Sequence, residues 1–170
     1  MIVDFDAFDL LTVAMYAERF HCVKIANEVP DVKKITTRYN SFVPHYLGAM
    51  GEYALKKALG CSLDMTVTKL GSDIPDTVVN GWTVQIKAVT FGGKDVEVPV
   101  NSMEHFNADV LVGVRIVNPV TCEILGCIQK ARFLKIHKVK DYGYGSRLMV
   151  SAADLSAISV LLKPRLPMPV

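Results

Sequence analysis

The chain has 170 residues, a length that suits one domain. About half of the residues are hydrophobic (51%) and 21% are charged, so the chain can bury a sizeable core and is not disordered by composition. The formal net charge of +2 is too small to indicate a nucleic-acid-binding protein by itself. No apolar run approaches the roughly 18 residues that cross a bilayer, and the acidic start is unlike a secretory signal. We therefore expect a cytoplasmic protein without a membrane span.

The first predicted element is a helix over residues 7–20. Asp6 is a suitable N-cap, with the acidic Asp9 three residues later, as in a capping box. An apolar stripe at helical spacing runs along this segment and consists of Phe8, Leu11, Ala14 and Met15. Residues 27–40 are polar and contain Pro30, which favours a surface loop or the entry to a second helix.

A second helix is predicted over residues 47–59. Its apolar residues recur with a period of 3.6, and Gly60 is a stop signal. Gly48 and Gly51 lack side chains, so we expect them to let the helix approach a sheet closely.

Beyond Gly60 the hydrophobic pattern alternates, which is typical of strands. Asn80-Gly81 between two β-rich runs predicts a hairpin with a type I′ turn. Strands are predicted at residues 65–68, 76–79, 82–89, 96–100, 108–117 and 122–128, a short helix within 129–140, and a last strand at 148–150 that could close the sheet. The order predicts an α/β (α+β) fold in which helices cover four to six mostly antiparallel strands.

The hairpin places chemical groups together. If Asn80 and Gly81 are the two loop residues, Asp76 lies opposite Gln85, about 4.5–5.5 Å away between β-carbons. Lys87 shares the face of Gln85 because side chains alternate along a strand. A longer loop would instead favour Asp73.

A carboxylate, an amide oxygen and an amine in one patch suit a hard cation beside a water molecule. Mg²⁺, for which Mn²⁺ can substitute, takes oxygen ligands and promotes phosphodiester hydrolysis. Glu52, at the border of the apolar stripe of the second helix, offers a second carboxylate. The alternative role for Glu52 is an ion pair with Lys56, one helical turn later.

Several motifs together resemble the PD-(D/E)xK nuclease superfamily, which has the restriction-endonuclease-like fold. The motifs are Gly48-Ala49-Met50-Gly51-Glu52 on a helix, Pro75-Asp76, the Val79-Asn80-Gly81 turn, Gln85-Ile86-Lys87, and the strand Ala108-Asp109-Val110-Leu111-Val112. The resemblance covers about residues 45–140. It implies a central mixed sheet flanked by helices and Mg²⁺-dependent cleavage of DNA.

The resemblance also implies roles for individual residues. Glu52 and Asp76 would be metal ligands, and the backbone carbonyl of Ile86 would complete the metal shell. Lys87 would position or activate the attacking water. Gln85 stands where the family usually has Asp or Glu, and its neutral carbonyl oxygen removes one negative charge, so we expect weaker metal binding.

Two functions follow as expectations. The first is a Mg²⁺-dependent deoxyribonuclease, an endonuclease of phage or resolvase type. The second is a non-catalytic DNA-binding or assembly module that retains the nuclease fold. In either case residues 1–170 would form a single nuclease-like domain in which residues 1–40 are an N-terminal helical extension. Small enzymes of this type often dimerise to cut two strands, so a homodimer is one expected assembly.

Basic residues are candidates for contacts with DNA phosphates, although a solvated helix face explains them equally well. The candidates are Lys33, Lys34, Arg38, Lys56, Lys130, Arg132 and Lys135. Trp82, directly after the predicted turn, is expected to pack against the protein rather than stack on a base.

Overall fold

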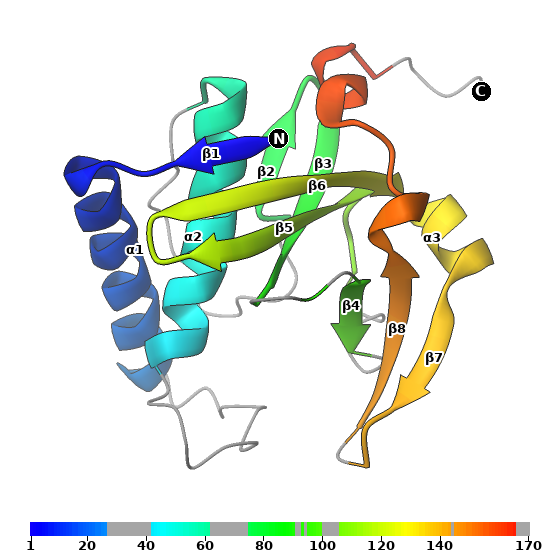
Figure 1. The fold of residues 1–170 in the computed structure, drawn as a ribbon, viewed down its shortest axis with the longest axis horizontal. Helices are drawn as coiled ribbons and strands as arrows, with labels where there is room; N and C mark the ends of the chain where they lie inside the picture. The colour runs from blue at the N-terminus through cyan, green and yellow to red at the C-terminus, as the bar shows by residue number, and fades with distance from the viewer. Residues whose placement is uncertain are drawn as a thin grey trace.

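The fold is described from a computed structural model of the chain. The structure describes residues 1–26, 42–61, 75–90, 93, 95–99, 106–143 and 145–165. The elements in chain order are β1 (Ile2–Asp4), α1 (Ala7–Ala26), α2 (Phe42–Leu59), β2 (Thr77–Val79), β3 (Trp82–Val89), β4 (Asp95–Pro99), β5 (Val110–Asn118), β6 (Thr121–Gln129), α3 (Lys130–Ile136), β7 (Lys138–Asp141), β8 (Ser146–Ser151) and the short 3₁₀ helices η2 (Ala152–Asp154) and η3 (Ile158–Leu162) (Figure 1).

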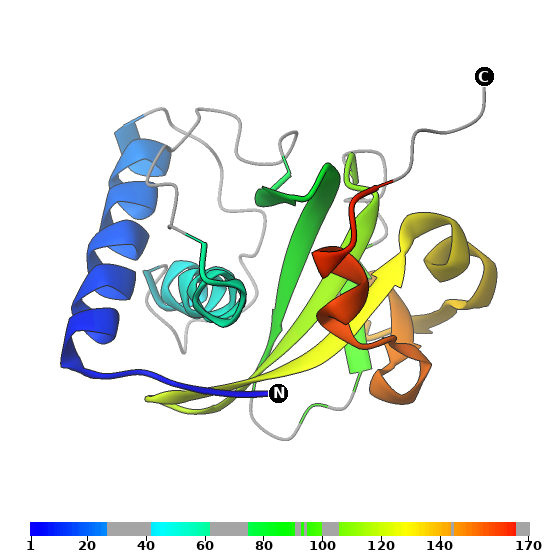
Figure 2. The same cartoon turned by 90° about the horizontal axis from the view of Figure 1, so that it is seen from above.

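Within the described residues the strands form two sheets. The main sheet has five strands in the order β1-β6-β5-β3-β2, and the second has three in the order β4-β8-β7. In the main sheet β3 and β5 are parallel, whereas the other neighbours are antiparallel. Helices α1 and α2 lie on one side of this sheet, and α3 with the second sheet lies on the other (Figure 2). The predicted α+β class with a mixed central sheet flanked by helices is therefore confirmed.

The last predicted strands differ from expectation in their partners. β4 and β8 pair with each other in the second sheet and do not close the main one. The predicted helix within 129–140 ends at Ile136, and Lys138 begins β7, which pairs with β8. The basic residues of this segment alternate with Val139, so the pattern is as compatible with an edge strand as with a helix.

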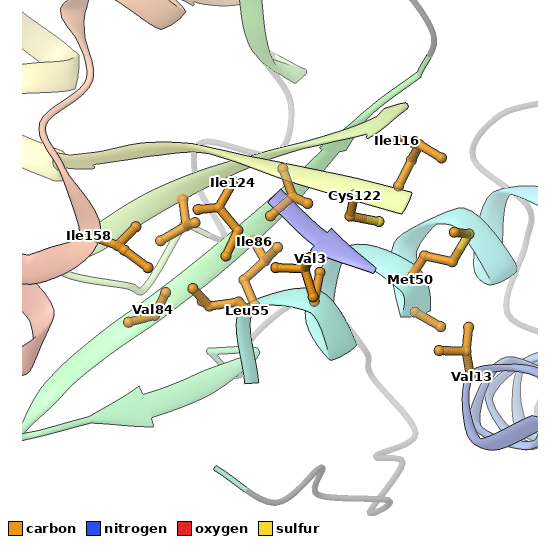
Figure 3. Close-up of a cluster of buried hydrophobic side chains, with 14 of the residues drawn as sticks. Val3, Val13, Met50, Leu55, Val84, Ile86, Ile116, Cys122, Ile124 and Ile158 are labelled. Carbon is orange, nitrogen blue, oxygen red and sulfur yellow. The ribbon is translucent and has the colours of Figure 1, made fainter. Parts of the chain in front are cut away.

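Each face of the main sheet packs against a separate hydrophobic core. The first core packs α1 and α2 against the sheet and includes Met50, Leu55, Val84 and Ile86 (Figure 3). The second core lies on the opposite face and includes Leu111, next to residues of β4, β8 and α3. Because β3 is covered on one face by α2, the alternation of its side chains decides which residues approach that helix.

Residues 1–26 belong to the main fold. β1 pairs with β6, and the first core contains the N-terminal residues Val3, Phe5, Val13, Tyr16 and Ala17. The expectation that residues 1–40 are an extension is therefore wrong for this part, because these side chains lose their solvent contact within the common core. The remaining part of that prediction, residues 27–40, lies outside the described residues.

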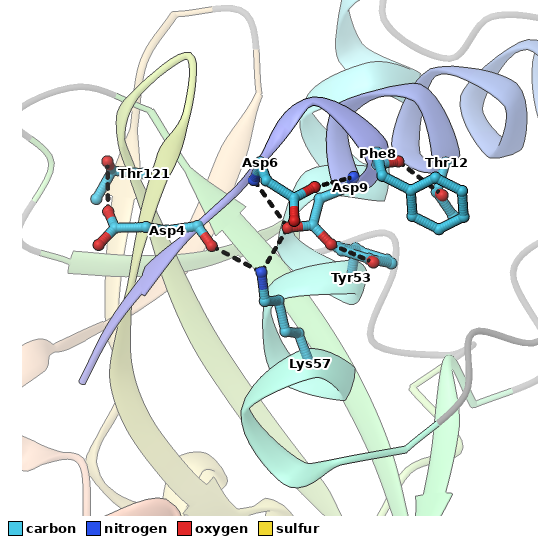
Figure 4. Close-up of polar contacts among 8 residues, drawn as sticks. All are labelled: Asp4, Asp6, Phe8, Asp9, Thr12, Tyr53, Lys57 and Thr121. Atoms are coloured by element: carbon cyan, nitrogen blue, oxygen red, sulfur yellow. Dashed lines mark hydrogen bonds and ion pairs between the residues drawn. The ribbon is translucent and has the colours of Figure 1, made fainter.

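The start of α1 confirms the predicted capping box. The N–H of Asp9 donates to Asp6 Oδ1 at 2.8 Å, and the N–H of Asp6 donates to Asp9 Oδ2 at 2.9 Å (Figure 4). The predicted apolar stripe, however, is on the outer side of the helix, where Phe8 is 74% exposed. The buried side is instead formed by Asp9, Val13, Tyr16 and Ala17.

α2 begins at Phe42, before the predicted start, and ends at Leu59, as expected from Gly60, which has a φ of +68°. A β-carbon on Gly51 would lie 3.3 Å from Ala88 Cβ, so the close approach of α2 to β3 depends on this glycine. Gly48 has no atom within 4 Å of the equivalent position. The close approach predicted for both glycines therefore holds only for Gly51.

The β2–β3 hairpin has the predicted two-residue turn. Asn80 and Gly81 have φ values of 48° and 83°, as a type I′ turn requires. Val79 pairs with Trp82 and Thr77 with Val84, which is the predicted register. The strand predicted at 65–68 lies outside the described residues.

No helix in the described ranges is long and apolar enough to cross a membrane.

Candidate active site

Asp76 lies immediately before β2, where that strand separates from β3. The backbone N–H of Ile86 donates a 2.6 Å hydrogen bond to Asp76 Oδ2. The carboxylate thus takes the place of a strand partner and satisfies a backbone donor of β3. The observed strand pairs end at Thr77 and Val84, so the predicted pairing of Asp76 with Gln85 is not among them, and the Asp76 carboxylate instead accepts from the next residue of β3, Ile86.

Glu52 reaches the same place from α2. It follows Gly51, whose missing side chain lets the helix lie close to Ile86 and Ala88 of β3. The hydroxyl of Tyr16 in α1 donates a 2.9 Å hydrogen bond to Glu52 Oε2. Burial, and then the charge of Asp76, raise the pKa of Glu52 to about 8, against the opposing effect of the Tyr16 hydrogen bond.

Lys87 lies on the strand face opposite Ile86 and Ala88, as alternation requires. Burial lowers its pKa, and the charges of Asp76 and Glu52 act against this shift. No nitrogen–oxygen distance of 4.0 Å or less joins Lys87 to either carboxylate among the described residues. The charges of both carboxylates therefore act on the pKa of Lys87, although neither forms a direct ion pair with its amine.

Gln85 shares the strand face of Lys87 and is half-buried. Its neighbour on β5 in the parallel register is Leu111, which belongs to the second core. Within the described chain, no hydrogen bond joins the Gln85 amide to Asp76 or Glu52. The structure therefore brings together the charged groups of Glu52, Asp76 and Lys87, and leaves Gln85 beside them only through the strand register.

Lys56 departs from its predicted place. The prediction sets it among the residues that contact DNA, but it is only 3% exposed. Its charge lowers the pKa of both Glu52 and Asp76, so it lies near the two carboxylates. Because its side chain is buried, Lys56 cannot contact DNA at the surface, and no ion pair joins it to Glu52 among the described residues.

The other candidate DNA contacts divide into three groups. Arg132 and Lys135 of α3 are exposed, as a contact with phosphate requires. Lys130 is half-buried, and its ammonium donates to the Phe106 carbonyl oxygen and lies 5.2 Å from the centre of the Phe106 ring. Its ammonium is therefore engaged within the protein, and its contact with phosphate stays a prediction. Outside the described residues lie Lys33, Lys34, Arg38 and the alternative ligand Asp73.

The donor set fits a magnesium site of low charge. Burial raises the pKa of Asp76, as it does for Glu52, so a cation between the two carboxylates would favour their charged forms. Mg²⁺ usually keeps several waters and needs only one or two protein carboxylates. Glu52, Asp76, the Ile86 carbonyl and the Gln85 amide would hold it. In the described ranges no group of three or more His, Cys, Asp or Glu residues that could hold a metal ion is found.

Tyr16 is the residue of this site that the sequence analysis missed. The sequence contains a helical face made of Val13, Tyr16 and Ala17, but the more apolar stripe through Phe8, Leu11 and Met15 outweighs it.

No protein-family model and no curated protein sequence matches this chain.

Proposed function

We propose that the protein is a Mg²⁺-dependent nuclease that hydrolyses DNA phosphodiester bonds, an endonuclease of phage or resolvase type. The observation that carries the proposal is the meeting of Glu52, Asp76 and Lys87 where β2 separates from β3. Two half-buried carboxylates with raised pKa values and a half-buried amine with a lowered one are typical of functional sites.

The proposed roles follow from the chemistry of each group. When bound, Mg²⁺ would polarise a phosphoryl oxygen and favour hydroxide over water. Asp76 and Glu52 would orient the cation through oxygens that the Ile86 N–H and the Tyr16 hydroxyl already hold. Lys87 Nζ, whose lowered pKa eases proton exchange, would position the attacking water or neutralise charge on the phosphate.

Partners and location belong to the same proposal. Exposed Arg132 and Lys135 on α3 would contact the DNA backbone. A homodimer would suit cleavage of two strands, with the exposed Phe8, Leu11 and Met15 of α1 as its interface. We further propose the cytoplasm as the place where the protein acts.

One observation favours the second candidate function, a non-catalytic DNA-binding or assembly module with the nuclease fold. Gln85 supplies no charge at the position where the superfamily has an acid, so the described site has two carboxylates instead of three. Such a site would hold a cation weakly, and DNA binding could outlast the loss of cleavage.

The test incubates the purified chain with supercoiled, linear and branched DNA in Mg²⁺, Mn²⁺ or EDTA. Lys87→Met removes the proposed catalytic amine, and Lys138→Met removes an exposed lysine of β7 as the matched control. The nuclease proposal expects cleavage that needs the metal, survives Lys138→Met and is lost in Lys87→Met. Equal cleavage by both variants would contradict it, and DNA binding without products in any metal would favour the second candidate.

A further inference from the structure

A hollow of about 540 Å³ lies apart from the three charged groups, near the beginnings of β3 and β5. Its lining includes Trp82, Asp109, Gln129, Lys130, Leu134 and Arg165. A second hollow of about 240 Å³ shares Trp82 and Gln129 with the first and adds Arg132. Trp82 therefore borders both hollows, which we call together the Trp82 groove. In Figure 1, α3 follows β6 directly, and η3 lies near the start of β3.

The indole of Trp82 is held in place by the C-terminal segment. Its N–H donates to the Lys163 carbonyl at 3.2 Å. The guanidinium carbon of Arg165 lies 5.5 Å from the centre of the indole ring, and the backbone N–H of Arg165 donates to the Asn80 carbonyl at 3.0 Å. Trp82 also packs at the border of the first core, as the sequence analysis expected, but it remains half-buried and so presents part of its ring to the groove.

Arg165 is fixed by a second contact. Its Nη1 lies 2.7 Å from Asp109 Oδ2, and the same oxygen accepts hydrogen bonds from the backbone N–H and the hydroxyl of Thr83. The guanidinium is thus tied to β3 and β5 at once. A ligand that stacks on this pair meets groups that are already in position, so less ordering entropy is lost on binding.

The charge of the groove favours an anion. Three basic side chains line it, Lys130, Arg132 and Arg165, against the single acidic side chain of Asp109. Arg132 is exposed on α3. Indole rings and guanidinium planes are the surfaces on which unpaired nucleobases stack, and neighbouring basic groups follow the phosphates.

We propose that the Trp82 groove binds an unpaired nucleotide of single-stranded DNA. The base would stack against the Trp82–Arg165 pair, and the adjoining phosphates would contact Arg132. Trp82 lies three residues before Gln85 on β3, about 10 Å along the strand and on the opposite face, at the end of the strand where the β2–β3 turn lies. The inference rests on the proposed function in one respect: the groove would select branched or frayed DNA for the site at Asp76.

The test uses the fact that Trp82 is the only tryptophan of the chain, so its fluorescence reports directly on the groove. A thymidine 12-mer is titrated into the full-length protein in EDTA, and the affinity is confirmed by the anisotropy of a labelled oligomer. We expect saturable quenching, and a blunt duplex of equal length should bind at least about tenfold more weakly. Trp82→Ala should weaken the anisotropy-detected affinity about tenfold or more, as expected for the loss of one stacked base.

Charge-matched variants separate the groove from general attraction. Arg132→Gln removes an exposed charge of the groove, and Arg19→Gln removes an exposed charge of α1 as the control. We expect weaker binding by Arg132→Gln alone. Equal affinities of both variants and the wild type, or equal binding of single strand and duplex, would overturn the inference.

The outcome is distinguishable from failure of the proposed function. Lys87→Met leaves the groove intact, so it should keep the preference for single strand over duplex, and Trp82→Ala should still weaken binding in its background, even if cleavage is lost. A protein that quenches with single strands but cleaves no DNA in any metal would refute the nuclease and support the groove. Metal-dependent cleavage without any binding in the groove would support the nuclease and refute the groove.

Discussion

The hydroxyl of Tyr16 in α1 donates a 2.9 Å hydrogen bond to a carboxylate oxygen of Glu52 in α2. Two helices that pack side by side are thus joined at one carboxylate of the candidate site. Because Tyr16 is buried in the first core, its ring is fixed and its hydroxyl presents a constant donor to Glu52. The N-terminal helix is therefore part of the site's architecture.

Tyr16→Phe should weaken metal-dependent cleavage while the fold is retained. The ring keeps its packing, but Glu52 loses a donor that favours its charged form, so its pKa should rise further. Loss of a group that orients a metal ligand typically costs about 10–100-fold in metal affinity or activity. The measurement is the Mg²⁺ concentration that gives half-maximal cleavage.

Tyr53→Phe is the matched control. It removes a hydroxyl that donates to Asp9 at 2.6 Å, away from Glu52. It should lower stability and leave the Mg²⁺ dependence of cleavage unchanged. A shift of the Mg²⁺ dependence of equal size in both variants would show that the Tyr16 hydroxyl has no special relation to Glu52.

Asp9→Asn should destabilise the protein in a pH-dependent way. Burial raises the pKa of Asp9, but hydrogen bonds from Lys57, Tyr53 and the Asp6 backbone outweigh burial, so the pKa falls below its ordinary value of 3.8 (Figure 4). A lowered carboxyl pKa contributes stability above 3.8 that is lost as the pH falls through the folded-state value. We expect a loss of about 1.5–3 kcal/mol at pH 7, from urea unfolding.

The same comparison at low pH checks the sign. Wild type and Asp9→Asn should converge in stability as the pH falls below 3.8, because protonated Asp9 no longer attracts Lys57. A stability difference that stays constant or grows on acidification would mean that the charge of Asp9 does not stabilise α1 against α2.

Gly51→Val should destabilise the protein and Gly48→Ala should not. The new β-carbon at position 51 would meet Ala88 Cβ at 3.3 Å and Ile86 Cγ2 at 3.6 Å, so α2 must move away from β3. Overpacking of this kind costs about 1–3 kcal/mol. Position 48 is open, so alanine there should gain up to about 1 kcal/mol from helix propensity. Thermal unfolding measures the stability of both variants. A greater loss of stability in Gly48→Ala than in Gly51→Val would contradict the prediction.

Gln85→Glu should lower the Mg²⁺ concentration needed for cleavage. A third carboxylate beside Asp76 restores a negative charge that the cation would neutralise. The reduction should be roughly tenfold, with Ala153→Glu, which adds a carboxylate at an exposed position of η2, as the control. An unchanged or raised Mg²⁺ requirement in Gln85→Glu would mean that position 85 does not face the cation.

The turns and helix ends could be predicted where a residue type is favoured for one physical reason, such as a positive φ or a capping hydrogen bond. Asn80-Gly81 specified the turn because both positions need a positive φ, and the Asp6–Asp9 pair specified the start of α1. The distribution of strands between two sheets was not predictable, because strand alternation reports a half-buried face and not the partner strand. β4 and β8 show the same pattern that a strand of the main sheet would show.

The site was predictable in its strand-borne part and less so in its helix-borne part. The turn register was sufficient to predict that Asp76 lies beside the middle of β3, where its carboxylate accepts from the Ile86 N–H between Gln85 and Lys87. Nothing in the sequence showed that Lys56 is buried near the same carboxylates or that Tyr16 reaches Glu52, since both depend on how α1, α2 and β3 pack. The apolar stripe that begins at Phe8 was expected to be the buried face of α1, but it is exposed. Hydrophobic periodicity identifies a face of a helix and does not show whether that face packs against the rest of the protein.

The most direct test of the proposed site compares Asp76→Asn with Asp154→Asn in Mg²⁺-dependent cleavage of branched DNA. Asparagine at position 76 can still accept the hydrogen bond of the Ile86 N–H, so the strand edge is kept while one charge is lost, and Asp154 is exposed in η2. We predict wild-type cleavage by Asp154→Asn and a loss of at least about 100-fold in Asp76→Asn. Wild-type cleavage by Asp76→Asn would contradict the central claim that this carboxylate holds the metal.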